Sequence, residues 1–315
     1  MLSYFPKSIS SIIKKFNKSS IWFKTLSLIV LILILTSIFK VSPKEGFDPA
    51  GGKKFVTFGN EDLYDKFYTS IYDDLSYDAK KNSFEVRTID RIAKIDKSSN
   101  VVDIGSGPGH HVKYYHSKGV KVQGLEKSKW MYARARTYDF NLKFKLGDVL
   151  RSDTYDADQF THALCLYYTV YYIRDKKQFF KNVYDWLKPG GTLVLHLVNR
   201  NKFNPILPAG DPLVGGVSPQ KFAKKRITTT LVKFNDFKYK ADFKHKKGED
   251  IAKLIETFTH DGTGHVRQNE HTLYMETQKN ILSKAKEMGF ILKGQVNMVE
   301  GECAYQYLYF LTKPE

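Results

Sequence analysis

The sequence contains little cysteine, because only Cys165 and Cys303 occur among its 315 residues. Two cysteines cannot build a disulfide framework, and no Cys/His spacing indicates a zinc site, so no metal is expected. This scarcity favours a reducing compartment. Cys165 stands in an apolar run, which predicts a buried thiol.

Acidic residues are also scarce, with 33 Asp and Glu against 50 Lys and Arg and a net charge of +17. The lysines are scattered along the chain rather than gathered in one block, which leaves two interpretations open. One is a solvated surface, and the other is a basic face that attracts anionic lipid or nucleic acid. No signature of an RNA-binding module accompanies the charge, so nucleic acid is a possible partner that is not favoured.

The first 20 residues contain no acid and form a basic tail, and residues 21–39 are then apolar apart from Lys24 and a few hydroxyl side chains. This is about the length that a helix needs to cross a bilayer. A signal peptide would have a shorter apolar region and a small-x-small cleavage site, which residues 37–42 lack. A buried soluble helix would be amphipathic. The sequence therefore predicts an uncleaved, single-pass transmembrane helix, with lysines on both sides that leave its orientation open.

A Pro- and Gly-rich segment at residues 42–55 predicts a linker, taken as residues 40–58, and a catalytic domain over residues 59–315. No N-x-[ST] glycosylation site follows residue 40, which favours a domain that faces the cytosol.

Residues 101–111, V-V-D-I-G-S-G-P-G-H-H, are the most informative stretch. An apolar run that stops at Gly105, Gly107 and Gly109 and restarts as a helix predicts a strand, a loop and a helix. Glycine allows a positive φ and the close approach of a ligand, and the helix N-terminus offers free N–H groups to that ligand. The spacing differs from the dinucleotide fingerprint G-x-G-x-x-G, and no Lys-Ser or Lys-Thr follows as in a P-loop.

Asp103 completes the pattern D-x-G-x-G-x-G, which resembles motif I of the class I methyltransferases that use S-adenosylmethionine. The resemblance implies that the loop wraps the methionine part of this cofactor and that Asp103 orients the loop or reaches the amino group through water. The loop residues concerned are Gly105, Ser106, Gly107 and Gly109.

Two later acids fit the same family. Glu126 follows an apolar run at residues 120–125, and an acid at the end of a second strand can accept hydrogen bonds from both ribose hydroxyls of a nucleoside. It resembles motif II of the family. Gly147-Asp148 resembles the family's G-D motif, which implies that Asp148 accepts from the adenine amino group.

Residues 62–78 are rich in tyrosine at helical spacing. One interpretation is an amphipathic helix whose aromatic side chains pack on the core. The other is the Tyr-x-x-x-Tyr-Asp helix that closes over the cofactor in methyltransferases resembling this chain, a pattern that Tyr68, Tyr72 and Asp73 match.

The alternation of strands and helices predicts an α/β fold, a doubly wound parallel sheet whose ligand crevice lies at the carboxyl ends of the strands. The resemblance implies the family's Rossmann-like seven-stranded sheet with an antiparallel last strand. Residues 160–173 are predicted to be one buried parallel strand, with Leu166 to Tyr168 facing the methyl group. K-P-G-G at residues 188–191 is expected to be a turn before a strand at residues 192–198. A helix at residues 277–288 and strands at residues 291–299 and 305–312 complete the expected domain.

Residues 199–275 form an insertion larger than a connecting loop. It begins with an irregular Pro-rich segment, a lid candidate, and continues with alternating patterns that predict antiparallel strands. Such strands resemble the substrate cap of several small-molecule methyltransferases; the alternative is a purely structural elaboration.

Methyl transfer requires no catalytic base, because the cofactor supplies the reactivity and the protein aligns the reactants. The candidate bases are His196, Tyr167 and His271, with Tyr168 and Asn199 beside them. No Asp/Asn-Pro-Pro-Tyr/Phe motif and no Pro-Cys nucleophile occur, which argues against adenine, glutamine and cytosine C5 as acceptors.

The sequence thus predicts a membrane-anchored S-adenosylmethionine-dependent methyltransferase that acts on a small molecule or a lipid headgroup. A protein or RNA acceptor, or a non-catalytic binding protein on the same fold, remains the alternative. The Lys-, Phe- and Tyr-rich composition with an N-terminal anchor also resembles membrane-anchored methyltransferase-like proteins of giant DNA viruses.

Overall fold

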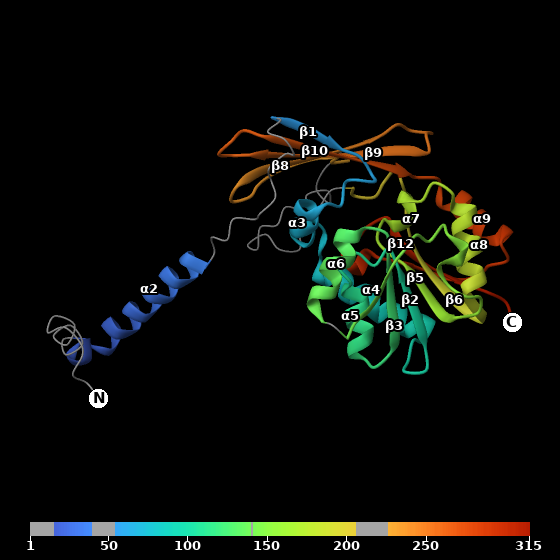
Figure 1. Cartoon of the computed structure of the whole chain (residues 1–315), viewed down its shortest axis with the longest axis horizontal. Coiled ribbons are helices and arrows are strands. Elements are labelled where there is room, and N and C mark those ends of the chain that lie inside the picture. The colour runs from blue at the N-terminus through green and yellow to red at the C-terminus, as the bar shows by residue number, and fades with distance from the viewer. Residues whose placement is uncertain (1–15, 40–53, 140, 206–225) are drawn as a thin grey trace. The chain divides into compact units, whose positions relative to one another are not determined.

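The computed structural model describes residues 16–39, 54–139, 141–205 and 226–315, which belong to two units, residues 1–45 and residues 46–315. The larger unit contains a seven-stranded sheet and a five-stranded sheet (Figure 1). The predicted linker residues 40–53 and residues 206–225 of the predicted lid lie outside the described residues.

The seven-stranded sheet has the order β11-β12-β6-β5-β2-β3-β4. Its strands are β2 (Asn100–Ile104), β3 (Lys121–Glu126), β4 (Lys143–Leu146), β5 (Phe160–Cys165), β6 (Leu187–Val198), β11 (Ile291–Asn297) and β12 (Gln306–Thr312). Pairing is parallel from β6 to β4, whereas β12 runs antiparallel to both of its neighbours. The predicted seven-stranded sheet with an antiparallel last strand is confirmed.

Helices cover both faces of this sheet (Figure 1). The core on one face includes α8 (Lys176–Trp186) and α9 (Gln278–Glu287), and the core on the other includes α4 (Ala79–Ala93) and α5 (His110–Ser117). Successive residues of β5 enter opposite cores, because Leu164 packs with α4 and α5 while Ala163 and Cys165 pack with α8 and α9. A strand that is buried on both faces has a continuous apolar sequence, which is why a buried strand could be predicted here. Cys165 is fully buried, as predicted.

The prediction of one strand over residues 160–173 is wrong. Strand β5 ends at Cys165, and the short helix α7 (Thr169–Tyr172) follows it. Tyr167 turns the chain out of the sheet with a φ of 54°. Helix α7 is apolar because it is buried too: Val170 and Tyr171 are inaccessible, and the Val198 N–H at the end of β6 donates to the Tyr171 hydroxyl at 2.8 Å.

The expected turn at residues 188–191 is instead the irregular start of β6, which pairs from Leu187 onward. The register against β5 shifts between Phe160 and His162, and Gly190 has a φ of 76°. The strand thus begins earlier than its apolar run, because the Gly-rich residues continue the pairing through a bulge.

The five-stranded sheet, here called the cap sheet, has the order β1-β10-β9-β8-β7. It comprises β1 (Phe55–Phe58), β7 (Thr229–Lys233), β8 (Phe237–His245), β9 (Ile251–His260) and β10 (Val266–Tyr274). The predicted antiparallel insertion is present. Strand β1 differs from expectation, since residues assigned to the linker pair in parallel with β10. Phe-Val-Thr-Phe has strong β-propensity, which the preceding Pro- and Gly-rich residues obscured.

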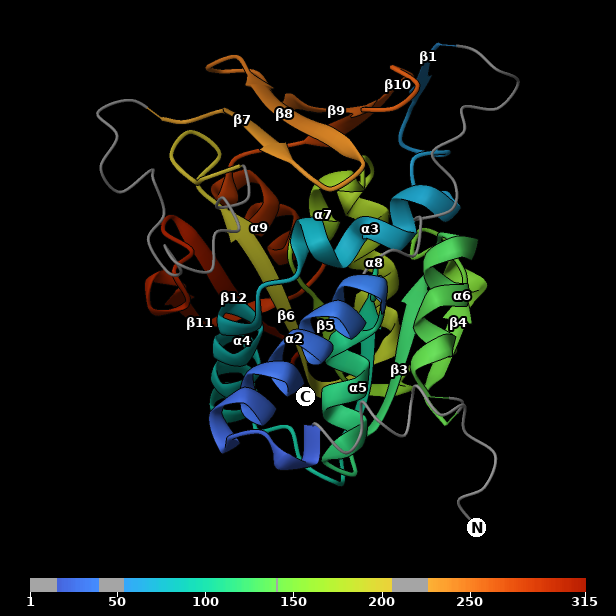
Figure 2. The ribbon, with the colours of Figure 1, turned by 90° about the vertical axis from the view of Figure 1, so that its left-hand side faces the viewer.

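Helix α3 (Lys66–Ser76) lies beneath the cap sheet (Figures 1 and 2). Its buried side chains Phe67, Tyr68 and Ile71 pack with Tyr239 of β8 and Phe258 of β9. The Arg267 guanidinium of β10 lies 4.0 Å from the ring centroid of Phe58, donates to the Leu63 carbonyl at 3.1 Å and pairs with the Asp65 carboxylate. The start of α3 is therefore joined to the cap.

Asp65→Ala is expected to lower the free energy of unfolding by about 2 kcal/mol. The Asp65 carboxylate caps α3 by accepting from the Tyr68 N–H at 2.9 Å, and it also balances the nearly buried charge of Arg267. Denaturant unfolding measures the change. Asp78→Ala is the matched control, because Asp78 caps α4 in the same way through the Lys81 N–H at 2.9 Å; it should cost about half as much. Equal losses would contradict a role for the Arg267 pair.

The predicted helix in the smaller unit is present as α2 (Ile21–Phe39). Among the described residues, however, no helix is long and apolar enough to cross a membrane, so the predicted transmembrane helix is not supported.

Candidate active site

The glycine loop joins β2 to α5 at the carboxyl edge of the parallel strands. Gly105, Gly107 and Gly109 all have positive φ, at 67°, 54° and 88°. A Cβ on Gly105 would lie 2.5 Å from Cγ2 of Thr169, and one on Gly109 would lie 2.5 Å from Cζ of Phe144. Gly107 is different, because nothing lies within 4 Å of its Cβ position. The outer glycines are therefore needed for close packing, whereas the middle one faces open space.

Ser106, between two of these glycines, has a buried hydroxyl with no hydrogen-bond partner among the described residues. A buried polar atom without a partner is costly, and a polar ligand in the loop would satisfy it. The loop therefore has the properties of a binding site for a polar group.

Glu126 ends β3 and closes over the same loop. Its carboxylate accepts from the Gly107 N–H at 2.9 Å and from the Ser128 N–H at 2.8 Å. Burial raises the pKa of this carboxyl, although backbone hydrogen bonds from Ser128, Gly107 and Lys127 act in the opposite direction. The acid thus lies beside the glycine loop with lone pairs left over for hydroxyl donors.

Asp148 follows β4, two residues beyond its end. Its carboxylate accepts from the Leu150 N–H at 3.0 Å and pairs with Lys127 at 2.9 Å. Glu126 and Asp148 therefore lie at the carboxyl ends of the neighbouring strands β3 and β4. A nucleoside laid along this edge could place its ribose at Glu126 and its base at Asp148.

Aromatic side chains adjoin the site. Tyr68 and Tyr72 of α3 lie with Tyr64 and with Tyr172 of α7, and the ring centroid of Tyr64 is 5.6 Å from Tyr68, 6.1 Å from Tyr72 and 6.3 Å from Tyr172. Burial raises the pKa of Tyr72 to about 12, and the Glu126 charge adds to this effect. The hydroxyls are neutral, and the cluster stands close to Glu126.

Asp73, the third residue of the predicted tyrosine motif, joins α3 to the catalytic sheet. Its carboxylate accepts from Arg134 of α6 (Lys129–Tyr138) at 2.6 Å and contacts Nε2 of His110 at 2.9 Å. Leu166, expected at the methyl group, is buried directly after β5.

The three candidate bases do not form one group. His196 is fully buried on β6, and burial lowers its pKa to about 4, so the imidazole is neutral. It stacks on Tyr168, with 6.0 Å between ring centroids. Tyr167 lies under Lys81, whose Nζ is 5.0 Å from the ring centroid. Asn199 accepts from the Asn201 N–H at 3.2 Å and has a local structural role.

His271 is the candidate that the structure places among ionisable partners. Its Nδ1 is 2.6 Å from the Tyr172 hydroxyl, and its Nε2 is 2.7 Å from Oε2 of Glu256. The sequence interpretation missed Tyr172, Tyr64 and Glu256. A signal for Glu256 existed, because it occupies the inward phase of an alternating strand with Ala252 and Phe258.

A second buried group was also missed. Glu85 of α4 is inaccessible, with Lys81 Nζ at 2.9 Å and His111 Nε2 at 3.3 Å. Although burial acts to raise the pKa of the Glu85 carboxyl, these neighbours lower it strongly overall, and the acid is ionised.

Residues 101–191 match the sequence model of a family described as "Methyltransferase domain". Comparison with curated proteins finds no match. Similar solved structures include a S-adenosylmethionine-dependent methyltransferase from Clostridium acetobutylicum, with 16% identity, a TM-score of 0.59 and coverage of 79% of this chain and 98% of the other. The CcbJ methyltransferase from Streptomyces caelestis has 15% identity and a TM-score of 0.61, with coverage of 81% and 100%.

The chain carries a class I S-adenosylmethionine-dependent methyltransferase domain. S-adenosylmethionine is therefore its cofactor. A third similar structure is the amino pentose methyltransferase of calicheamicin biosynthesis from Micromonospora echinaspora, solved with the cofactor bound; it has 19% identity and a TM-score of 0.54, with coverage of 81% and 99%. The residues present fit this cofactor: an open glycine loop, an unpartnered Ser106 hydroxyl and Glu126 with free lone pairs.

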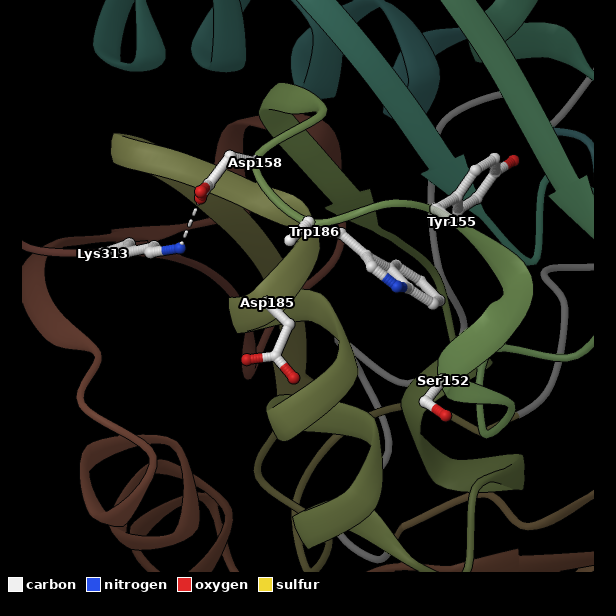
Figure 3. A pocket seen from close by; sticks show the side chains of 7 residues that line it. Ser152, Tyr155, Asp158, Asp185, Trp186 and Lys313 are labelled. Atoms are coloured by element: carbon white, nitrogen blue, oxygen red, sulfur yellow. Dashed lines mark hydrogen bonds and ion pairs between the residues drawn. The ribbon is translucent and has the colours of Figure 1, made fainter.

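The methyltransferase domain also has a depression of about 400 Å³ far from this loop (Figure 3). It is lined by Ser152, Tyr155, Ala157, Asp158, Asp185, Trp186 and Lys313. Asp158 precedes β5, so the depression lies at the amino edge of the parallel strands, opposite the glycine loop. Lys313 is satisfied there by Asp158 at 2.8 Å and by the Leu187 carbonyl at 2.7 Å, which indicates a structural role.

Asp103 gives the methyltransferase a pH-dependent stability. Burial raises its pKa from 3.8 to about 6, an effect that nearby His111 opposes and that Glu126 supports. A carboxyl whose folded pKa is raised stabilises the fold fully below about pH 4, and this contribution is lost as the pH rises through about 6. In wild type relative to Asp103→Asn, the free energy of unfolding should fall by at most about 1.4 kcal/mol for each pH unit in this window. Denaturant unfolding from about pH 4 to 7 measures it, and parallel profiles would contradict the burial argument.

Proposed function

We propose that this methyltransferase transfers a methyl group to a small polar molecule that binds between the glycine loop and the cap sheet. The observation that carries this proposal is the cap itself: α7, which follows β5 at the cofactor edge, is joined to β10 through Tyr172 and His271. A covered edge admits a small acceptor more readily than a folded protein or an RNA duplex.

We propose the following cofactor contacts, which the open glycine loop and its neighbouring acids support. Gly105, Ser106, Gly107 and Gly109 hold the methionine part, Glu126 accepts from the ribose hydroxyls and Asp148 accepts from the adenine amino group. Asp103 supports the loop from beneath, while Leu166, Tyr68 and Tyr72 line the methyl-transfer region. When bound, S-adenosylmethionine supplies a methyl group on a positively charged sulfur, and the side chains align the acceptor and exclude water.

The similar structures support a small acceptor. One is an amino pentose methyltransferase, and another is a sugar N-methyltransferase from a Streptoalloteichus species, with 16% identity, a TM-score of 0.53 and coverage of 87% of this chain and 98% of the other. Sugars and amino sugars, free or carried on a lipid, are therefore the first acceptors to examine.

The decisive experiment gives the full chain methyl-labelled S-adenosylmethionine together with fractionated metabolites, lipids, proteins and RNA. Label in a metabolite or lipid fraction is expected. Label confined to protein or RNA would contradict the small-molecule proposal, and a folded protein that does not bind the cofactor would indicate a non-catalytic binding protein.

We also propose that α2 holds the enzyme at a lipid membrane. Large apolar side chains are exposed along the helix, namely Ile21, Trp22, Phe23, Leu26, Leu28, Ile29, Val30, Leu31 and Ile32. Helices that are apolar on all sides are covered by apolar surroundings, which a bilayer provides. Flotation of the full chain with liposomes tests this, and an Ile29→Asp variant that floats equally well would count against α2 as the attachment.

A further inference from the structure

A chain of hydrogen bonds connects the cap sheet to the methyl-transfer region. The Tyr172 hydroxyl of α7 lies 2.6 Å from Nδ1 of His271, and Nε2 of His271 lies 2.7 Å from Oε2 of Glu256. The Tyr239 hydroxyl donates to the other Glu256 oxygen at 2.7 Å. His271 is 1% exposed and Glu256 is 2% exposed, so these groups have little contact with water.

The charge of Glu256 fixes which groups donate and which accept along these hydrogen bonds. Burial alone would raise the pKa of the carboxyl, but His271 and the hydroxyls of Tyr68 and Tyr239 lower it overall, so the carboxylate is ionised. An ionised carboxylate only accepts hydrogen bonds. In the neutral imidazole that the relay requires, Nε2 of His271 donates to this carboxylate, which leaves Nδ1 to accept from the Tyr172 hydroxyl.

The Tyr172 end of these hydrogen bonds lies in the tyrosine cluster, with 6.3 Å between the ring centroids of Tyr172 and Tyr64. The pKa of Tyr64 is raised well above 10, first by burial and then by the charges of Tyr172, Tyr72 and Glu126, with a contribution from its hydrogen bond to Tyr172. The Tyr64 carbonyl accepts from the Ser128 hydroxyl at 3.1 Å, and the Ser128 N–H donates to the Glu126 carboxylate. Tyr64 thus joins the acid proposed for the ribose to Tyr172, and an acceptor bound beside this pair would meet the Tyr172 hydroxyl.

We propose that Tyr172, His271 and Glu256 form a proton relay that serves a neutral hydroxyl acceptor, so that the enzyme is an O-methyltransferase. The inference rests on the proposed function and deepens it by naming the acceptor group. Tyr172 is the catalytic residue that contacts the acceptor, while His271 and Glu256 act through it.

The proposed step accounts for every proton and electron pair. The acceptor oxygen forms a bond to the methyl carbon as the carbon–sulfur bond of the sulfonium breaks, and the sulfur keeps the bonding electron pair. The acceptor's proton moves to the Tyr172 oxygen while the Tyr172 proton moves to Nδ1 of His271. The products are a methyl ether, a neutral thioether and an imidazolium that Glu256 stabilises.

The relay favours a hydroxyl over an amine acceptor. A neutral hydroxyl is a weak nucleophile that gains from removal of its proton, whereas a neutral amine can attack without a base. The group presented to the acceptor is a neutral phenol, which can accept one hydrogen bond while donating another.

The groups that face His271 come from every element packed around it. They are Tyr172 of α7, Glu256 of β9, and Tyr68 of α3, whose ring centroid is 5.9 Å from that of His271. Glu256 provides the single charge among these groups, and it lies directly against the imidazole.

The test uses the full chain and a panel of methyl glycosides that carry hydroxyl groups only or one amino group in addition. For wild type, methyl transfer to oxygen is expected. Tyr172→Phe is expected to lower kcat by about 100-fold and to leave cofactor affinity unchanged. Glu256→Gln should lower kcat with little change in KM, because the imidazole loses its anionic partner while the acceptor contacts remain.

Tyr155→Phe is the matched control, since it removes another largely buried phenol, one that donates to Gln123 at 3.4 Å at the opposite edge of the sheet (Figure 3). Its activity should equal that of wild type. Methylation of nitrogen alone, an unchanged kcat in Tyr172→Phe, or no methylation of any glycoside by a cofactor-binding enzyme would each overturn the relay. Failure to bind the cofactor would instead overturn the proposed function.

Discussion

Glu126→Ala is expected to weaken S-adenosylmethionine binding by about 300-fold, which corresponds to about 3.4 kcal/mol. The carboxylate would make two charge-assisted hydrogen bonds to the ribose, each worth about 1.5–3 kcal/mol. The variant also loses the acceptor for the Gly107 N–H and so releases the middle of the glycine loop. Isothermal titration calorimetry with the cofactor measures the change.

Glu287→Ala is the control for this experiment, because Glu287 is an exposed acid that pairs with Lys177 on the helical surface. It should bind the cofactor as wild type does. Unchanged affinity in Glu126→Ala, with a normal unfolding transition, would mean that Glu126 does not contact the ribose.

Gly105→Ala is expected to lower the free energy of unfolding by about 3 kcal/mol and to abolish methyl transfer. About 1–2 kcal/mol comes from a φ of 67° in a residue with a Cβ, and overpacking adds about 1–3 kcal/mol. The new methyl group would lie 2.5 Å from the Thr169 side chain at the start of α7, the helix that also carries Tyr172. Denaturant unfolding and the methyl-transfer assay together measure both effects.

Substitutions at two other glycines distinguish the cost of backbone strain from the cost of steric conflict. Gly107→Ala shares the positive φ, but nothing lies within 4 Å of its Cβ position, and the same is true of Gly248 in the turn between β8 and β9. Both should cost only about 1–2 kcal/mol, and Gly248→Ala should retain activity. Equal losses at Gly105 and Gly248 would show that contact with Thr169 is unimportant.

The sequence predicted the cofactor and the strands that carry the glycine loop, because their determinants are local. The glycine spacing, Asp103 and Glu126 each mark the end of a buried parallel strand, and such strands produce a strong apolar signal. The seven-stranded sheet follows from the same repeated pattern and from the rule that parallel strands need crossovers.

The acceptor side could not be predicted, because its residues meet across long sequence separations. Tyr172 and His271 are 99 residues apart, and Glu256 meets His271 only because β9 and β10 pair with Leu254 opposite His271. No spacing rule links these positions. Their one sequence signal was polarity on the inward face of an alternating strand, which is weak without the strand register.

The errors in the fold have equally physical causes. Residues of helix α7 were predicted to continue strand β5. Both elements are buried and apolar, and a short apolar run does not distinguish a buried helix from a buried strand. Strand β1 was read as linker because its pairing with β10 depends on residues more than 200 positions away.

Helix α3 and the residues before it have a consequence for the kinetics. Asp73 binds Arg134 and His110 on the side of the catalytic sheet, and Asp65 binds Arg267 on the side of the cap. The ring of Tyr64 lies 6.3 Å from that of Tyr172, and its carbonyl accepts from the Ser128 hydroxyl, next to the acid proposed for the ribose. From this placement we expect an ordered steady-state mechanism, in which S-adenosylmethionine binds first and the demethylated cofactor leaves last.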